Sequence, residues 1–563
     1  MTLSAATKPV KAAKKQARPP KLTDAQLAAQ AVTRILGAHS QPRYDLATEP
    51  WIPVLRDGEV VTIGLRELLT EAHQISDLAL PNALLRASMR RLLGALTADL
   101  IRRHPGLSLD DWRAAHSTNC GFTPAQVDLL LNAHGRHLWL WHPASPFLQD
   151  PRLARGLVKP HVNQPAQELL LHLPSGSSAA WWVKAGEPAL LGGLRPDQSA
   201  LWLTVRWFYG VNGNCGDVRI PDGATVGSHA GGAFAETVAT VTHAFRVDSV
   251  SLFRSLLRGL GQALPQSDRV HGDLSTCAWL DPDQPRPVDD PLYLATVNVS
   301  AVLLAEADED GNTTRFVRGS TPVAGEQAKL IRDLAMRADT HRVTVPNEKG
   351  HPAAVRVLPS ALRGDVLQAF HRAGFEGLQL AGVINSAQCW LPVGGIVAGG
   401  ERLELLLVGK AGTGSSPVWD ELSGMQLPAR HLDPAHPDPE VVRHVRAAVQ
   451  IAFDPKDGVR QRLEWAVADL LAQPGPDGWK RPKRDNTTAQ ALTNKAVNAW
   501  LSRTAAAFDR VLDSDSEDEV EAWRTAVWSA ARAAFDEIAT PYITSTRYAP
   551  RYAVALRQLT SRR

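Results

Sequence analysis

Lys410 stands in the stretch GKAGTGSS (residues 409–416), whose residue types suggest a phosphate-binding loop. A Walker A loop places Gly-Lys-Ser/Thr four residues after a first Gly, so that the lysine reaches phosphates from the start of a helix. Here Lys410 precedes the glycines and Pro417 follows them. This order favours a surface loop, and a nucleotide-dependent enzyme stays an alternative hypothesis.

Histidine and cysteine spacing shows no catalytic or metal-binding pattern. The 18 histidines form neither HExxH nor H-x-E followed by PCxxC, the signatures of zinc hydrolases and deaminases. No CxxC pair occurs among the four cysteines, which are Cys120, Cys215, Cys277 and Cys389. We therefore predict no catalytic residue, no cofactor and no metal, and a reducing, cytoplasmic location.

Two adjacent aromatic residues and a lysine lie in SSAAWWVKAGEP (residues 177–188), within a region rich in Gly and Ser. Aromatic rings beside a cation can stack a nucleobase and hold its phosphate. The segment therefore predicts a nucleic-acid contact by Trp181, Trp182 and Lys184. A loop anchored by a core tryptophan explains the same residues.

Two further irregular segments suit binding rather than catalysis. GSHAGGAF (residues 227–234) holds Gly231 and Gly232, and glycine lets a backbone approach a ligand closely. INSAQCWL (residues 384–391) places Asn385, Ser386 and Gln388 between apolar residues, and amides can both donate to and accept from base edges. A connecting loop and a polar turn are the alternative interpretations.

Basic residues gather in two places. KRPKRDN (residues 480–486) contains Lys480, Arg481, Lys483 and Arg484, which suit contact with phosphates. The first 22 residues carry six basic residues and no acid, which is typical of a disordered tail. A solvated loop and a solubilising tail are the open alternatives.

These segments need elements to position them, and local patterns predict several. Thr23 caps a predicted helix over residues 23–39, and Asp57-Gly58 predicts a hairpin between WIPVL and EVVTIGL, with Trp51 and Ile52 buried. Residues 82–104 form an amphipathic helix with its arginines on the face opposite the apolar stripe. Residues 291–319 are predicted to form two strands around an Asp-Gly turn.

The composition changes near residue 432, in the Pro- and Asp-rich HLDPAHPDPE. Everything after it is predicted helical, over residues 438–453, 455–472, 489–513, 516–538 and 548–561. At 563 residues the chain is long enough for several domains, and it has no apolar run of a membrane span's length. We predict an α+β fold: a basic tail (1–22), a large mixed α/β domain of irregular topology (23–432) and a C-terminal four-helix bundle (433–563).

In order along the chain, the motifs resemble the CasA family, the large subunits of type I-E CRISPR Cascade surveillance complexes. YDLATEPWIPVLRDGEVVTIGLRELL (residues 44–69) is similar to the family's N-terminal signature, and HPASPFLQ (142–149) to its HPF-Q loop. The tryptophan segment, GSHAGGAF, AWLDP (278–282), INSAQCWL and the terminal helices follow in the family's order. The resemblance extends from about residue 44 to the end of the chain.

The resemblance implies a non-catalytic subunit for antiviral defence. Such a subunit recognises the PAM in double-stranded target DNA and wedges the duplex open for the guide crRNA, which starts the R-loop. It implies DNA contacts by residues of two loops, His229, Gly231, Gly232, Asn385, Ser386, Ala387 and Gln388, with Gln388 as the wedge. It also implies contact of Trp181, Trp182 and Lys184 with the guide or neighbouring subunits, and of Lys480, Arg481, Lys483 and Arg484 with the non-target strand.

The implied partners are the backbone, small and guide-end-capping subunits and the helicase-nuclease, and no membrane. Two departures from the family matter. Paired zinc-binding cysteines found in some relatives are missing here, and residues 292–304 lack basic side chains. A general protein-interaction scaffold is the remaining alternative.

Overall fold

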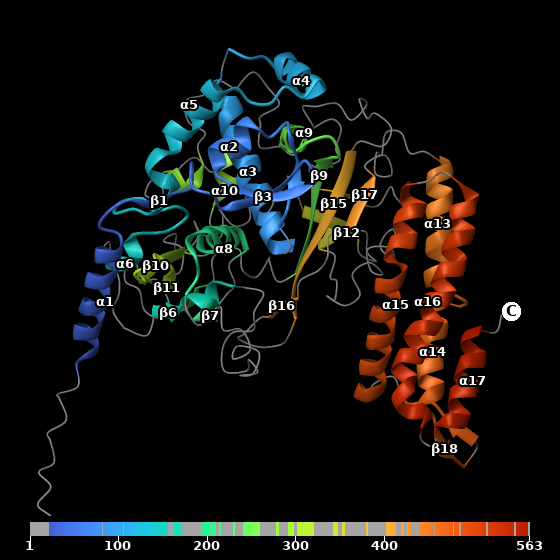
Figure 1. The fold of residues 1–563 in the computed structure, drawn as a ribbon. Helices are drawn as coiled ribbons and strands as arrows, with labels where there is room; N and C mark the ends of the chain where they lie inside the picture. Colours follow the sequence, from blue (N-terminus) through green and yellow to red (C-terminus); the bar gives the residue numbers. More distant parts are fainter. Residues whose placement is uncertain are drawn as a thin grey trace, which may run out of the picture.

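The computed structural model describes most of the chain between residues 22 and 560. The described residues are 22–80, 83–104, 106–155, 163–170, 193–209, 213–214, 229–230, 240–258, 277–280, 291–297, 301–319, 342–346, 352–354, 379–380, 401–411, 418–420, 425–428, 439–454, 456–476, 478–483, 486–513, 516–544 and 548–560. Helices and strands mix before residue 430 and helices dominate after it, which makes the fold α+β (Figure 1). Among the described helices, none is long and apolar enough to cross a membrane.

The first elements form where local sequence signals predict them. Thr23 caps α1 (Asp24–Ala38) through a capping box with Gln26. The predicted hairpin is β2 (Ile52–Arg56) and β3 (Glu59–Ile63), and Asp57 and Gly58 take positive φ values of 52° and 83°. That turn geometry is why Asp-Gly is favoured there.

The signature residue Trp51 is fully buried, and its indole N–H donates to the Leu46 carbonyl at 2.9 Å. Ile52 is equally buried. The ring of Phe147 packs edge-on against Trp51, with 5.6 Å between the ring centroids. Gln149 of the HPASPFLQ segment is buried between two strands. Its amide N–H donates to the Leu140 carbonyl at 2.6 Å, and its amide oxygen accepts from the Leu304 N–H at 2.8 Å. Both motifs therefore stabilise the fold.

Helix α3 (Ala83–Arg102) runs through the core of this part of the chain. The predicted apolar stripe is buried, and the arginines of this helix do not all face solvent. Arg90 is only 7% exposed, and its guanidinium pairs with Glu404 at 2.8 Å and Asp77 at 2.9 Å. Partners distant in sequence make that burial possible.

A seven-stranded sheet lies beside α3, with strand order β13-β12-β9-β15-β16 and with β14 and β17 paired to β12 and β15. The long strand β9 (Thr240–Asp248) pairs antiparallel along its full length with residues 401–409 of β15 (Glu401–Ala411). The other strands of this sheet are β12 (Arg342–Pro346), β13 (Pro352–Ala354), β14 (Gln379–Leu380), β16 (Val418–Asp420) and β17 (Met425–Pro428).

Smaller sheets and helices complete this part. Residues 291–319 are a helix, α10 (Pro291–Thr296), and a hairpin, β10 (Ala301–Ala307) and β11 (Thr313–Gly319), so the prediction of two strands is right only for the second half. The remaining elements are β1 (Arg43–Asp45), α2 (Leu65–Thr70), β4 (Ile75–Leu78), α4 (Leu109–Thr118), α5 (Pro124–His134), β5 (Trp139–Trp141), α6 (Arg152–Arg155), β6 (Asn163–Pro165), α8 (Pro196–Tyr209), β7 (Gly213–Asn214), β8 (His229–Ala230) and α9 (Leu252–Arg258).

The helices of the C-terminal region, residues 439–560, lie side by side (Figure 1). They have their own apolar core. Helix α15 contacts β17. The prediction that everything here is helical misses one hairpin, β18 (Gln473–Gly475) and β19 (Gly478–Lys480). The helices are α13 (Pro439–Phe453), α14 (Val459–Leu470), α15 (Thr487–Asp513), α16 (Glu517–Ile543) and α17 (Ala549–Thr560).

Candidate functional site

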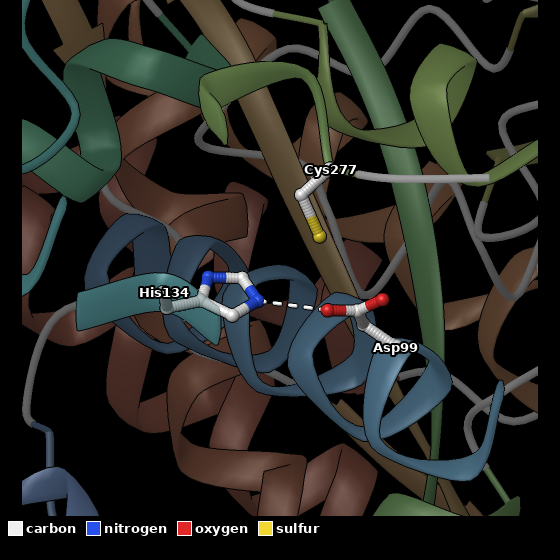
Figure 2. A group of neighbouring side chains, drawn as sticks. All are labelled: Asp99, His134 and Cys277. Carbon is white, nitrogen blue, oxygen red and sulfur yellow. Dashed lines mark hydrogen bonds and ion pairs between the residues drawn. The ribbon is translucent and has the colours of Figure 1, made fainter. Parts of the chain in front are cut away.

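Asp99, His134 and Cys277 bring three possible metal ligands together in the core. Their ligand atoms lie within 4.8 Å of one another, and all three side chains are buried. Asp99 comes from α3 and His134 from α5, while Cys277 directly precedes a short 3₁₀ helix (Ala278–Leu280). Figure 2 shows the thiol pointing toward the bonded His134 and Asp99.

The hydrogen bonds of His134 decide what this cluster can do. The Trp279 indole N–H donates to Nδ1 of His134 at 3.2 Å, so Nδ1 is an acceptor without a proton. The proton of the neutral ring is then on Nε2, which donates to the Asp99 carboxylate at 2.8 Å (Figure 2). A metal would need the lone pair of Nε2 and would force a proton onto Nδ1, facing the Trp279 N–H. The donor set therefore does not fit a metal ion.

The network is a structural one. Burial alone raises the pKa of Asp99, but hydrogen bonds from His134 and Arg103, with the Arg103 charge, hold it below its ordinary value. The carboxylate is thus ionised at neutral pH and joins α3 to α5. Cys277 is 0% exposed and has no access to a substrate.

Residues predicted to bind DNA or guide RNA lie mostly outside the described part of the chain. This holds for residues of three segments, namely Trp181, Trp182, Lys184, Gly231, Gly232, Asn385, Ser386, Ala387 and Gln388. His229 is described as backbone, in β8, where it pairs with Asn214 of β7. Their predicted roles stay predictions.

Three of the four predicted phosphate-contacting residues are described, and they differ in surroundings. Lys480 and Lys483 are exposed at and just after the end of β19. Arg481 is instead fixed by the Asp469 carboxylate, to which its Nε and a terminal nitrogen donate at 2.7 and 2.8 Å. The hydrogen bond to Asp469 raises the pKa of Arg481. Arg484 lies outside the described residues.

The same hairpin carries a residue that the sequence reasoning missed. Trp479 in β19 is 49% exposed, and the Arg551 guanidinium carbon lies 4.8 Å from its ring centroid. The signal in the sequence was the position of this tryptophan directly before KRPKRDN. Trp479, Lys480 and Lys483 are thus exposed side chains in and just after this hairpin.

The candidate nucleotide-binding segment, residues 409–416, does not begin as a phosphate-binding loop would. Gly409, Lys410 and Ala411 are the last residues of β15 and pair with β16, with Lys410 opposite Trp419. A phosphate-binding lysine instead stands at the start of a helix, after a glycine-rich turn. This placement argues against the nucleotide hypothesis.

Comparison with known structures defines the class of protein through its fold. A chain of a structure described as "CRISPR RNA-guided surveillance complex" matches 92% of this chain and 100% of its own length, with a TM-score of 0.59 and 18% identity. CRISPR-associated protein Cse1 from Acidimicrobium ferrooxidans matches 92% of this chain and 98% of its own, with a TM-score of 0.61 and 18% identity. The fold is therefore that of Cse1 proteins.

Sequence comparison gives the family. Residues 45–534 match the family CRISPR-associated protein Cse1, and the chain belongs to that family. A curated relative, CRISPR-associated protein CasA/Cse1 of Thermus thermophilus, is 35% identical over 142 residues, which are 25% of this chain and 26% of the relative. That alignment spans only about a quarter of either protein.

Proposed function

We propose that this chain is a non-catalytic subunit of a CRISPR RNA-guided surveillance complex, and that it recognises the PAM in double-stranded DNA and starts strand opening. The observation that carries the proposal is the family match over residues 45–534. It is supported by the fold shared with a chain of such a complex. The matched proteins are named as CRISPR-associated proteins or complexes, without an enzyme name.

Two parts of the chain would divide the work. Residues 23–432 would contact the PAM and the guide end, and residues 433–563, as a helical bundle of four main helices, would contact small subunits and the displaced strand. Separate apolar cores before and after residue 432 support this division. The chain would also help recruit the helicase-nuclease to the assembled complex.

The physics of guided recognition explains why such a subunit needs no catalytic group. Forming the RNA–DNA hybrid roughly balances the loss of the DNA duplex, so the slow event is opening the first base pairs. A side chain inserted beside the PAM lowers the cost of that event. Gln388 would insert, with Asn385, Ser386 and Ala387 before it.

PAM contact would come from the glycine loop. The minor groove is narrow and offers a degenerate pattern, so a backbone without side chains suits a permissive PAM code. Gly231 and Gly232 would supply that backbone, with His229 beside them. Trp181, Trp182 and Lys184 would contact the guide RNA or its neighbouring subunits.

The test separates duplex contact from strand opening. A complex reconstituted with Gln388→Ala is expected to bind a PAM-containing duplex nearly normally but to open it at least about tenfold more slowly, the effect of ~1.4 kcal/mol. Permanganate reactivity of thymines beside the PAM measures opening, and a gel shift measures contact. The control is Gln30→Ala, an exposed glutamine on α1. Unchanged opening by Gln388→Ala would exclude the wedge.

A further inference from the structure

We infer that the open edge of β3 (Glu59–Ile63) is a docking site for an extended segment of another protein, which adds a strand to the sheet β3-β2-β4. The segment that fits carries β-branched side chains and has a basic residue at the end that lies beside the turn of the hairpin. The inference goes beyond the proposed function, because none of the residues proposed to contact DNA or RNA lies in this sheet.

Two residues of β3 direct their backbone groups away from the sheet. The Pro53 carbonyl accepts from the Ala79 N–H at 3.0 Å, so the backbone of Pro53 faces β4 and not β3. Thr62 stands opposite Pro53 in the register of the two strands, and Val60 lies two residues earlier. In an antiparallel ladder, opposite residues either bond to each other or both point outward, in alternation. The N–H and C=O groups of Val60 and Thr62 therefore point to the open edge of β3.

This edge is left open in the described part of the chain. Among the described strands, only β2 pairs with β3, and the two outward-facing residues have no backbone hydrogen bond to another described element. The edge of β10 is instead covered, since the Asp150 N–H donates to the Val302 carbonyl at 2.9 Å and the Gln149 amide oxygen accepts from the Leu304 N–H at 2.8 Å. Unpaired groups along an exposed edge are a template for a further strand.

The side chains around the edge favour a protein segment over nucleic acid. Val60 is 64% exposed, and Leu55, which stands opposite it in β2, is partly buried. Such an apolar pair is suited to a β-branched residue on the next strand. Asp57 and Glu59 are exposed at the turn, while the Arg56 guanidinium already pairs with two glutamates. This negative charge repels phosphates and attracts a lysine or arginine of the incoming strand.

A second copy of this chain suits the edge less well than a basic strand. Antiparallel pairing of two β3 strands about Val61 would place Glu59 of each copy opposite Ile63 of the other. The carboxylate would then have an apolar neighbour across the strands and no cation, whereas opposite charges stabilise a cross-strand pair.

The experiment uses the full chain and a fluorescently labelled, acetylated peptide amide, Thr-Ile-Thr-Val-Lys, whose antiparallel pairing would set its valine opposite Val60 and its lysine opposite Glu59. Fluorescence anisotropy gives the affinity. Val60→Pro removes an outward N–H but no hydrogen bond to β2, and it is expected to weaken binding about tenfold. Val60→Thr keeps the N–H and the β-branched shape, so its affinity should stay within about threefold of that of the unmodified chain.

A second peptide tests the edge without changing the protein. It has the same sequence with the isoleucine and valine amides N-methylated, which removes the donors that would face β3, and it should not bind. Equal binding of the two peptides, or no binding of the first at about 1 mM, would overturn the inference. Equal affinity of Val60→Pro and the unmodified chain would do the same.

Light scattering of the chain without peptide tests the other occupant. Self-association that Val60→Pro abolishes would show that a second copy covers the edge, which overturns the inference, and a monomer is the expected result. No step uses DNA or the assembled complex, so failure here leaves the proposed function standing, and failure of PAM recognition leaves this inference standing.

Discussion

At the scale of single residues, the buried Asp99–His134 pair shows how α3 is fixed to α5. Asp99 accepts from both His134 and Arg103 and is 1% exposed. A buried carboxylate that accepts hydrogen bonds from two donors is stable. Removing it leaves both donors without their acceptor, which lowers the stability of the fold. The pair thus joins α3 to α5, and the bond from the Trp279 N–H to His134 adds the segment after Cys277.

Asp99→Ala is expected to lower the free energy of unfolding by about 3 kcal/mol, because it leaves His134 and Arg103 without a buried partner. Chemical denaturation followed by circular dichroism measures the loss. The control is Asp110→Ala on α4, whose side chain is 86% exposed and pairs with Arg113. That variant should change stability by less than about 0.5 kcal/mol, and equal losses for the two variants would contradict the structural role of Asp99.

Stability should also fall in acid for a specific reason. Burial raises the pKa of Asp99 and of Glu404, but charge and hydrogen bonds from their partners win and hold both values below normal. A depressed pKa adds stability above the unfolded-state value, about 4, and this stability is lost as pH falls through the folded value. The free energy of unfolding is expected to change less between pH 7 and pH 3 for Glu404→Gln than for the unmodified chain.

At the scale of elements, long-range contacts position what local sequence forms. Glu404 of β15 accepts from Arg86 and Arg90 of α3 at 2.8 Å each, and so attaches the helix to the large sheet. Sequence could predict α1 through Thr23 and the hairpin through Asp57-Gly58, because those signals lie within a few residues. It could not predict the burial of Arg90 or the partners of Gln149, which depend on residues far along the chain.

At the β18–β19 hairpin, too, the packed chain shows what the local sequence does not. The four basic residues after Trp479 are visible in the sequence as a charged run, but only the structure shows that the exposed Arg481 is fixed by Asp469. The sequence does not single out Trp479, because most tryptophans are buried. The structure places it in the hairpin between α14 and α15, where it is exposed. Burial is a property of the packed chain, so local patterns do not supply it.

Arg481 is expected to hold the β18–β19 hairpin. Arg481→Lys keeps the charge but cannot donate two parallel hydrogen bonds to Asp469, so amide hydrogen exchange over residues 473–483 should become faster. Lys483→Ala, a nearby exposed cation, is the control and should leave exchange unchanged while lowering the salt dependence of oligonucleotide binding by about one charge. Equal exchange in both variants would show that the ion pair does not order the hairpin.

The position of Lys410 in a strand predicts that ATP does not stabilise the chain. Because Lys410 pairs within the sheet and does not open a helix, millimolar ATP with magnesium should not raise the melting temperature of the chain. Differential scanning fluorimetry measures this shift. A rise that Lys410→Ala abolishes would restore the nucleotide hypothesis.

At the scale of the whole molecule, family and fold agree over nearly the entire chain. The family match ends at residue 534, while the fold match with the Acidimicrobium ferrooxidans protein covers 92% of the chain. The stretch EPWIPVLRDGEVV pointed to the family, yet its Trp51 and Ile52 are buried and serve the core. Trp51 and Ile52 therefore serve the core, while the residues proposed to contact DNA lie in other segments of the resemblance.

The most direct test of the proposed function compares surveillance complexes assembled with and without this chain on linear targets whose flanking sequence is randomised. The account predicts that R-loops form only when the chain is present, and only beside a restricted set of flanking sequences. Sequencing of the opened targets gives that set. R-loop formation with the same flanking preference in the complex that lacks the chain would contradict the account.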